Sequence, residues 1–423
     1  MTTKRMMMRP GVWLNYVNTD RFKTGCFSFN LLQPLEYATA APNALTPSVL
    51  LRGCGLCPDM QQISRHLDLL YGASCGTLVR KKGEVQTVGL YADFLEDRYA
   101  EGEPVFQSMM QFLRSLMLDP CLEDGGFVEE YLAGEKQNLI NTIDSRLNEK
   151  RAYAISRLLK HMCAGERYAV PRLGEKETLA QVEGRELYTR WQTLLASSPV
   201  ELFYLGQQPE QAVLEALEPL IAGLPTGERK AVPPTAVLCP DRPVQVVEET
   251  MDVTQGKLTL GLRTEITAMD PRYPAMMLLN AVFGSGATSK LFEEIREKQS
   301  LCYYASSSMD KFKGIMVVDS GIECSNYDVA REGILQQLEL CRQGSITQDE
   351  LETARSYLLS ALRTGKDSPG RLDDYAIGQA IAGSGRTMED LADCLRQVTL
   401  DQVVETANTL TLDTVYFLKG VEA

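Results

Sequence analysis

The sequence predicts an α+β protein made of two similar domains, each a sheet with helices packed over it. Three observations support this prediction. The chain of 423 residues exceeds the usual size of a single hydrophobic core. Residues 223–236, GLPTGERKAVPPTA, are rich in proline, glycine and charge, which disfavours both helix and central strand. Predicted elements follow one another in the same order on both sides of this segment.

Each half begins with strands and a helix, continues with a strand-rich segment and two long helices, and closes on a strand that ends in glycine. Apolar residues at helical spacing predict the helices, and alternating or continuous apolar runs predict the strands. In the first half the opening strands are VWLNYV and CFSFNLL, and the segment that matches them in the second half is TLGLRTEI; the first helix, with Ile63, Leu67 and Leu70, matches the helix with Leu291, Phe292 and Ile295. The strand-rich segment GEVQTVGLYA matches GIMVVDSGI, and the closing strand VELFYLG matches TVYFLKG. The two long helices are VFQSMMQFLRSLML and FVEEYLAGEKQNLINTI in the first half, and VAREGILQQLELC and QDELETARSYLLSALR in the second. The shared closing strand favours duplication, with domains at 1–222 and 237–423 and a linker at 223–236.

Composition narrows the class of protein. With 44% hydrophobic and 23% charged residues the chain is an ordinary globular one. Its net charge of −13 argues against nucleic acid as a partner, because such binding needs a basic face. There is no apolar run long enough to span a membrane and no signal-peptide pattern at the start. We therefore expect a cytoplasmic protein with no membrane and no nucleic-acid partner.

Cysteine usage agrees with this location. The eleven cysteines are odd in number and form no disulfide framework, so reduced, buried thiols are expected. Cys54 and Cys57 have the CxxC spacing of zinc and redox sites, but no second CxxC completes a four-thiolate set. Metal or redox use of this pair stays open as a minor alternative.

The most informative stretch is FGSGATSKLFEEIREKQSLCYYAS, residues 283–306. A phosphate-binding loop needs the form GxxxxGK[ST], whereas here Lys290 lies inside the predicted helix. A tight turn in which Thr288 or Ser289 caps the helix explains the glycines more simply. It does not explain the hydroxyl-rich, aromatic segment that follows.

This stretch closely resembles the second-domain signature of the M16 (pitrilysin or insulinase-like) metallopeptidases. The signature has a glycine-rich turn, a Ser-x-Leu-Phe helix, Arg-Glu-Lys and then Leu-x-Tyr. The resemblance extends over almost the whole chain. It implies two duplicated domains of the LuxS/MPP-like metallohydrolase fold, each a mixed, mainly antiparallel sheet covered by helices, arranged as a clamshell.

The resemblance also implies a pair of substrate-binding residues. The family's arginine and tyrosine fall on Arg296 and Tyr303, and Tyr304 is the alternative if the register shifts by one. A guanidinium and a phenol are donors that can hold a peptide carbonyl and a developing oxyanion. Taken without the motif, these residues would be an ordinary helix arginine and an ordinary strand tyrosine.

The zinc site of the family is missing. The segment NALTPSVLLRG, residues 43–53, resembles the family helix that bears His-x-x-Glu-His, in which two imidazoles hold zinc and the glutamate activates its water. In this register the two histidines fall on Ala44 and Ser48, and the catalytic glutamate falls on Pro47. The later glutamate ligand falls on Thr142, and Glu135 matches another acidic position of the family one helical repeat earlier. The chain has two histidines, His66 and His161, and neither is in motif spacing. The resemblance therefore implies no catalytic residue and no metal on this chain.

These features place the chain with the zinc-less, short-chain, YmfF-like bacterial members of the family. The resemblance implies a non-catalytic subunit that pairs with a zinc-bearing M16 homologue, or associates with itself. It would contribute a chamber wall and the contacts of Arg296 and Tyr303 to a peptide substrate, with zinc on the partner. A peptide-binding or scaffold protein that adds strands at a sheet edge is the first alternative, and an enzyme using Cys54 and Cys57 is the second.

Overall fold

The computed structural model describes residues 2–420, and the chain forms two compact units that each draw on both halves of the sequence. The first unit contains the residues up to Asp144, Val170–Pro234 and Asp367–Ile381. The second contains Ser145–Ala169, Thr235–Lys366 and the residues from Ala382 onward. The compact units are thus not the two contiguous segments that the sequence suggested.

The first unit is built on a six-stranded sheet in the order β1-β2-β8-β3-β5-β4. All neighbouring strands are antiparallel except β2 and β8, which are parallel. The strands are β1 (Thr2–Arg9), β2 (Val12–Asn18), β3 (Thr24–Pro34), β4 (Ser74–Lys82), β5 (Val85–Leu95) and β8 (Val200–Gly206), and a separate small ribbon is formed by β6 (Leu122–Glu123) and β7 (Gly126–Phe127).

The second unit is built on a five-stranded sheet in the order β11-β12-β10-β13-β9. Here β13 and β9 are parallel and the other neighbours are antiparallel. The strands are β9 (Gln245–Thr250), β10 (Gly256–Arg263), β11 (Cys302–Asp310), β12 (Ile315–Ile322) and β13 (Thr411–Lys419).

The two sheets share one topology. Read from the parallel end, β2-β8-β3-β5-β4 corresponds strand by strand to β9-β13-β10-β12-β11, and β1 is an addition to the first sheet. In both, the closing strand of the half lies between the parallel neighbour and a central strand. The prediction of two similar α+β units with mainly antiparallel sheets is confirmed.

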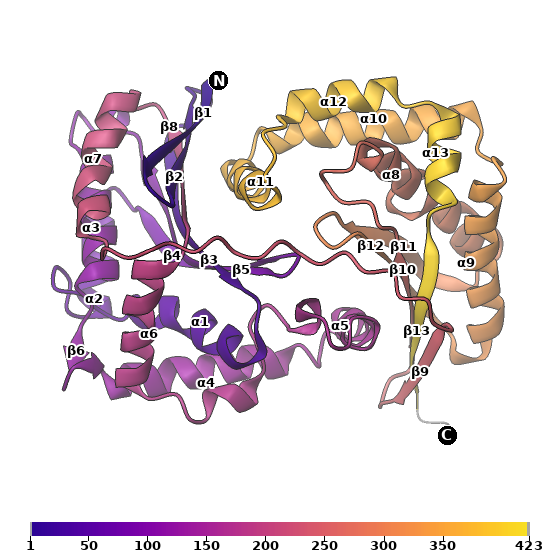
Figure 1. Cartoon of the computed structure of the whole chain (residues 1–423), viewed down its shortest axis with the longest axis horizontal. Helices are drawn as coiled ribbons and strands as arrows, with labels where there is room; N and C mark the ends of the chain where they lie inside the picture. Colours follow the sequence, from indigo (N-terminus) through magenta and orange to yellow (C-terminus); the bar gives the residue numbers. More distant parts are fainter. Residues whose placement is uncertain (1, 421–423) are drawn as a thin grey trace. The chain divides into compact units, whose positions relative to one another are not determined.

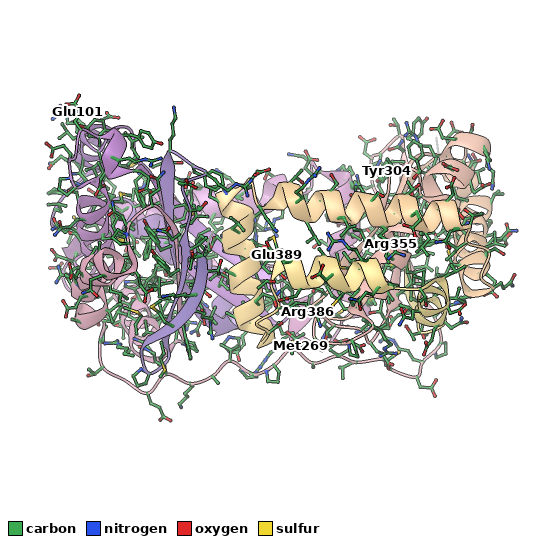
Figure 2. The ribbon with its side chains drawn as sticks, turned by 90° about the horizontal axis from the view of Figure 1, so that it is seen from above. Glu101, Met269, Tyr304, Arg355, Arg386 and Glu389 are labelled. Atoms are coloured by element: carbon green, nitrogen blue, oxygen red, sulfur yellow. The ribbon has the colours of Figure 1, made fainter. Side chains whose placement is uncertain are left out.

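Helices pack against both faces of each sheet (Figure 1). Those of the first unit are α1 (Tyr37–Leu50), α2 (Met60–Leu69), α3 (Val105–Leu118), α4 (Glu129–Ser145), α6 (Gly184–Ser197), α7 (Glu210–Gly223) and α11 (Pro369–Ala382). Those of the second are α5 (Lys150–Met162), α8 (Tyr273–Asn280), the π-helices η4 (Ala281–Ser285) and η5 (Leu291–Lys298), α9 (Tyr327–Arg342), α10 (Gln348–Gly365), α12 (Met388–Gln397) and α13 (Leu400–Ala407). Helices α10 and α12 lie alongside each other, and the buried guanidinium of Arg355 on α10 donates to the carbonyls of Leu395 and Val398 at the end of α12 (Figure 2).

Two helices, α5 and α11, pack on the sheet of the opposite half of the sequence. On α5, Ala154 and Leu158 join a buried cluster with Val317 of β12 and with residues of β13. On α11, Asp373 accepts a hydrogen bond of 2.8 Å from Ser28 of β3 and pairs with Arg80 of β4. This exchange is why the compact units are discontinuous. Hydrophobic spacing shows that a helix is buried on one face, but not against which sheet.

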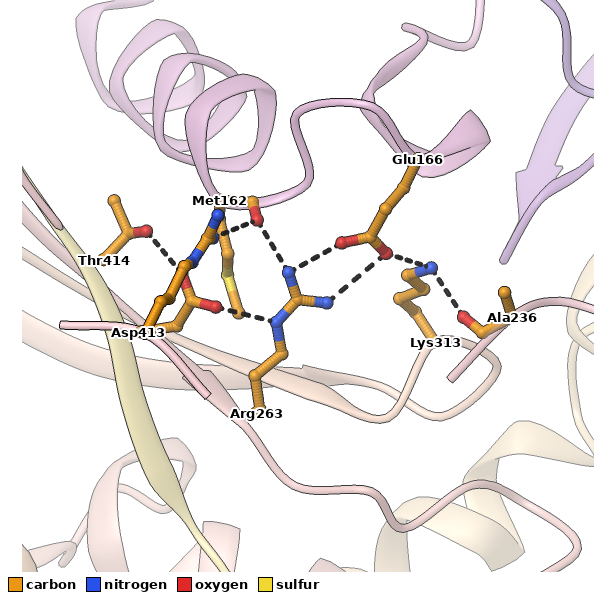
Figure 3. Close-up of polar contacts among 8 residues, drawn as sticks. Met162, Glu166, Ala236, Arg263, Lys313, Asp413 and Thr414 are labelled. Carbon is orange, nitrogen blue, oxygen red and sulfur yellow. Dashed lines mark hydrogen bonds and ion pairs between the residues drawn. The ribbon is translucent and has the colours of Figure 1, made fainter. Parts of the chain in front are cut away.

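A buried ionic network fixes the segment after α5 to the second sheet (Figure 3). The Arg263 guanidinium bonds Glu166 at 2.8 Å and Asp413 at 3.1 Å, and Lys313 reaches the other oxygen of Glu166 at 2.5 Å. Burial alone would raise the pKa of Glu166, but the hydrogen bonds from Arg263 and Lys313 outweigh it and lower that pKa below the ordinary value. The network therefore holds Glu166 charged inside the unit.

Candidate functional site

The glycine-rich turn predicted from the sequence leads into the π-helix η5 of the second unit. The Ser289 hydroxyl accepts a hydrogen bond of 3.4 Å from the Phe292 amide, so Ser289, one of the two predicted caps, lies at the start of the helix. Lys290 donates to Glu350 on α10 at 2.7 Å. A lysine engaged in this ion pair is not aimed at the turn, which agrees with a structural turn rather than a phosphate loop.

Arg296 lies on η5 and makes only weak contacts within the chain. Its side chain is 42% exposed, its Nε is 3.6 Å from Glu297 Oε1, and its Cζ lies 4.8 Å from the centre of the Phe292 ring. A pair at 3.6 Å is too long for a good hydrogen bond. The guanidinium donors of Arg296 are therefore available to a molecule outside the chain.

Tyr303 lies at the start of β11, which packs against η5. The ladder with β12 pairs Cys302 with Ile322 and Tyr304 with Gly321, so Tyr303 is an extra residue in a β-bulge. Bulges turn a side chain away from its place in the regular sheet. Tyr303 is 59% exposed.

The neighbouring Tyr304 is held inside the unit instead. Its carbonyl accepts a 2.9 Å hydrogen bond from Ser320, and the Arg151 guanidinium lies 4.5 Å from the centre of its ring. Burial and then the carboxylate of Asp319 raise the pKa of Tyr304 to about 12. Of the two adjacent tyrosines, Tyr303 is the one whose phenol faces outward. Arg151 itself was not found from the sequence, where it reads as an ordinary helix arginine.

The degenerate zinc-motif positions of the first unit lie on α1, and their surroundings are structural. Ala44 and Pro47 are buried, and Ser48 is half-buried. Asn43, which is 0% exposed, donates to Gln86 at 3.0 Å and accepts from Arg190 at 2.7 Å. The helix is thus fixed by apolar packing and by an amide network at the position just before the motif.

The second part of the motif lies on α4. The Thr142 hydroxyl donates to the Asn138 carbonyl of its own helix at 2.8 Å. Glu135 is engaged by Arg52, whose Nε donates to it at 2.6 Å, so the end of the α1 segment and α4 are brought together by an ion pair. To bind zinc, Glu135 would first have to give up its ion pair with Arg52, and this makes it a poor zinc ligand.

Neither histidine nor the CxxC pair replaces the missing ligands. His66 packs 5.1 Å from Phe112 in the first unit, and His161 stacks on Tyr416 in the second. Burial lowers the pKa of both imidazoles. Cys54 and Cys57 are buried, and burial raises the pKa of the Cys57 thiol, which disfavours the reactive thiolate.

Across residues 2–420 no group of three or more histidine, cysteine, aspartate or glutamate side chains could hold a metal ion. Within the same residues no helix combines the length and apolar character needed to cross a bilayer.

Comparison with known proteins identifies the relatives of this chain. Residues 182–358 match the family model described as the peptidase M16 inactive domain. Over 415 residues, 97% of this chain and 96% of the relative, it is 31% identical to a Bacillus subtilis (strain 168) protein described as the probable inactive metalloprotease YmfF. The chain belongs to the M16 family. The resemblance to zinc-less, YmfF-like members is thereby confirmed.

Solved structures agree with this membership. A conserved protein from Enterococcus faecalis V583 is 28% identical and superimposes with a TM-score of 0.91 over 99% of both chains. A structure described as the peptidase M16 inactive domain from Pseudomonas fluorescens shares the fold at 16% identity, with a TM-score of 0.79 over 100% of this chain and 99% of the other.

The residues at the zinc positions predicted from the sequence do not fit the metal. Zinc in such a site needs three protein ligands from imidazole or carboxylate groups, and Ala44, Ser48 and Thr142 supply none. Pro47 cannot replace the glutamate that activates water. The chain is thus a homologue of M16 proteins that are described as inactive and metalloprotease-like.

Proposed function

We propose that this chain is the non-catalytic subunit of a heterodimeric M16 peptidase. It pairs with a zinc-bearing M16 homologue, closes part of the partner's chamber and presents Arg296 and Tyr303 to the bound peptide. The single observation that supports this most is the contrast between the motifs. None of the zinc positions predicted from the sequence holds a ligand, while the arginine and the tyrosine remain exposed and free of strong contacts within the chain.

The chemistry of the two side chains suits this role. Neither group is needed to hold its own unit together, and each carries donors that match a peptide carbonyl. A donor held in place before the reaction stabilises the oxyanion that develops when the carbonyl is attacked. Exposed donors of this kind have little effect on folding, and their effect appears only when a substrate is bound.

The second candidate is a peptide-binding scaffold without a peptidase role. It is favoured by the free edge of the second sheet, where β11 has a single neighbour and therefore unpaired backbone groups along its outer side. An extended peptide can add to such an edge as another strand. This candidate assigns no catalytic consequence to Arg296 or Tyr303.

Reconstitution separates the two candidates. The chain and the zinc-bearing M16 homologue from the same organism are purified alone and together, and hydrolysis of a fluorogenic peptide library is followed with and without chelator. The peptidase subunit predicts chelator-sensitive turnover that rises sharply when the two are mixed. It also predicts that Arg296→Ala lowers this turnover, whereas Lys298→Ala, a matched cation on the same helix, does not. No association between the proteins, or equal turnover with and without this chain, contradicts the peptidase role.

A further inference from the structure

The bulge that turns Tyr303 outward depends on how Tyr304 is held. Cys302 pairs with Ile322 and Tyr304 pairs with the next residue of β12, Gly321, so Tyr303 has no partner on β12. The regular pairing after the bulge therefore begins at Tyr304 and depends on Tyr304 staying against Gly321. A Cβ on Gly321 would lie 2.5 Å from Cε1 of Tyr304, so the ring rests directly on the glycine. Replacing Gly321 by a larger residue must displace the ring.

Arg151 covers the same tyrosine ring from α5. Its Cζ lies 4.5 Å from the ring centre, within the range of a cation–π contact, and Lys257 adds a second cation at 5.6 Å. The ring therefore has contacts from the sheet and from α5, a helix that comes from the first half of the sequence. Among residues 2–420, Arg151 is the only arginine whose guanidinium contacts the Tyr304 ring.

Arg151 is itself fixed to the strands beside the bulge. Its Nε and Nη2 bond the two oxygens of Asp319 at 2.5 and 3.2 Å, and Nη2 also donates to the Ser306 hydroxyl at 2.7 Å. Ser306 in turn donates to Asp319 at 2.9 Å. Asp319 lies on β12 and Ser306 on β11, so one planar guanidinium joins both strands and the ring of Tyr304. A lysine could keep the charge, but it has neither the fork nor the plane.

We propose that Arg151 is a positioning residue for Tyr303. By holding Tyr304 and the β11–β12 pair, it keeps the bulge in the one form that directs the Tyr303 phenol outward. This inference rests on the proposed function, in which Tyr303 contacts the substrate. It adds that a helix from the first half of the chain sets the geometry of the substrate contact in the second unit.

The first test uses the free chain and needs no partner or substrate. Hydrogen exchange is measured on the peptide that contains Tyr303 and Tyr304 in the wild type, Arg151→Lys and Gly321→Ala. The proposal predicts faster exchange in both variants. Arg157→Lys is the matched control, because Arg157 lies on the same helix but pairs with Glu249 on β9 at 2.9 Å. Unchanged exchange in both Arg151→Lys and Gly321→Ala overturns the proposal whatever the activity shows.

The second test uses the reconstituted pair and the fluorogenic peptide library. Misplacement of a reacting or binding group by about 1 Å can cost up to about 100-fold in rate. We expect Arg151→Lys and Gly321→Ala to lower kcat by about 10- to 100-fold with little change in KM, because the donor is displaced rather than removed from ground-state binding. Arg157→Lys should leave kcat unchanged.

Comparison with Tyr303→Phe distinguishes the two levels of failure. If Tyr303→Phe lowers kcat and Arg151→Lys does not, the positioning role is wrong and the proposed function stands. If Tyr303→Phe and Arg296→Ala both leave kcat unchanged, the proposed function is wrong, and the role of Arg151 toward a substrate contact is wrong with it.

Discussion

In the first unit, the segment that resembles the M16 zinc helix is packed into the structure, with Ala44 buried and Asn43 bonded at both ends of its amide. In the second unit, the segment that resembles the substrate-binding motif leaves Arg296 and Tyr303 exposed and weakly contacted. The first segment stabilises its own unit. The second is held by residues outside it, such as Arg151 and Asp319, which both bond Ser306.

The difference agrees with the proposed function, in which the zinc positions are lost and the substrate contacts are kept. At the predicted motif positions on α1, Ala44 and Pro47 are buried, so packing determines these residues, whereas Thr142 on α4 is exposed. Where donors remain, they are placed by neighbours and have no fold-stabilising contacts of their own. Substitutions should therefore affect stability in the first segment and turnover in the second.

The largest loss of stability should follow Glu166→Gln in the second unit. Removing one partner of a buried charge network leaves Arg263 and Lys313 undercompensated, at a cost of about 3–5 kcal/mol. Folding lowers the pKa of Glu166, so the charged carboxylate stabilises the folded protein at pH values above the pKa of an ordinary glutamate. This contribution is lost as the pH falls through the lowered pKa of the folded state. Hydrogen exchange of β10 and β13 against pH measures this loss, and Glu248→Gln, on an exposed pair with Lys419, is the control. A wild type and a Glu166→Gln variant with the same acid profile would contradict it.

Asn43→Ala should give the next largest effect, in the first unit. It removes the donor to Gln86 Oε1 and the acceptor of Arg190 Nε, while the Gln86 amide keeps its bonds to the carbonyls of Ala40 and Arg172. Leaving these two buried polar atoms unpaired costs about 3 kcal/mol. Both tryptophans, Trp13 and Trp191, belong to the first unit, so their emission reports its unfolding in urea. The midpoint should fall in Asn43→Ala and stay unchanged in Asn141→Ala, an exposed asparagine on α4. Equal midpoints would show that the segment is not structural.

Ala44→His should restore a motif residue and still destabilise the first unit. Ala44 is 4% exposed, and an imidazole there overpacks the core at a cost of about 2 kcal/mol. The tryptophan-detected midpoint should fall relative to Ala133→His, an exposed site on α4. A raised midpoint on addition of zinc would contradict the view that this site is closed to the metal.

The smallest effect on stability is expected for Arg296→Ala and Tyr303→Phe. Both side chains are exposed, so the unfolding free energy of the second unit should change by no more than about 0.5 kcal/mol. Circular dichroism in urea and hydrogen exchange of β11 test this directly. A loss of several kcal/mol would mean that these residues are part of the fold.

Much of this contrast is readable in the sequence. Apolar spacing predicts the strands and helices and their repeated order, and the signature around Arg296 locates the exposed donors. The exchange of α5 and α11 is not readable, because Leu158 or Leu372 shows that a helix is buried but not which sheet covers it. Arg151 holds Tyr304, so that Tyr303 is the tyrosine that faces outward. The sequence around the two tyrosines does not indicate this contact, because Arg151 lies far away in the sequence. Asn43 is a polar residue that the sequence alone would place at the surface. Its burial is explained only by its hydrogen bonds to Gln86 and Arg190, which are distant in the sequence.

The central claim is that Tyr303 acts on the partner's reaction and not on the fold of its own chain. The most direct measurement is kcat of the reconstituted pair with Tyr303→Phe, compared with Tyr357→Phe, an exposed tyrosine on α10. Loss of one donor to a developing oxyanion typically lowers kcat by about 10²–10³-fold, and we predict a loss of this size for Tyr303→Phe and none for Tyr357→Phe. Equal kcat for the two variants and the wild type would contradict the claim.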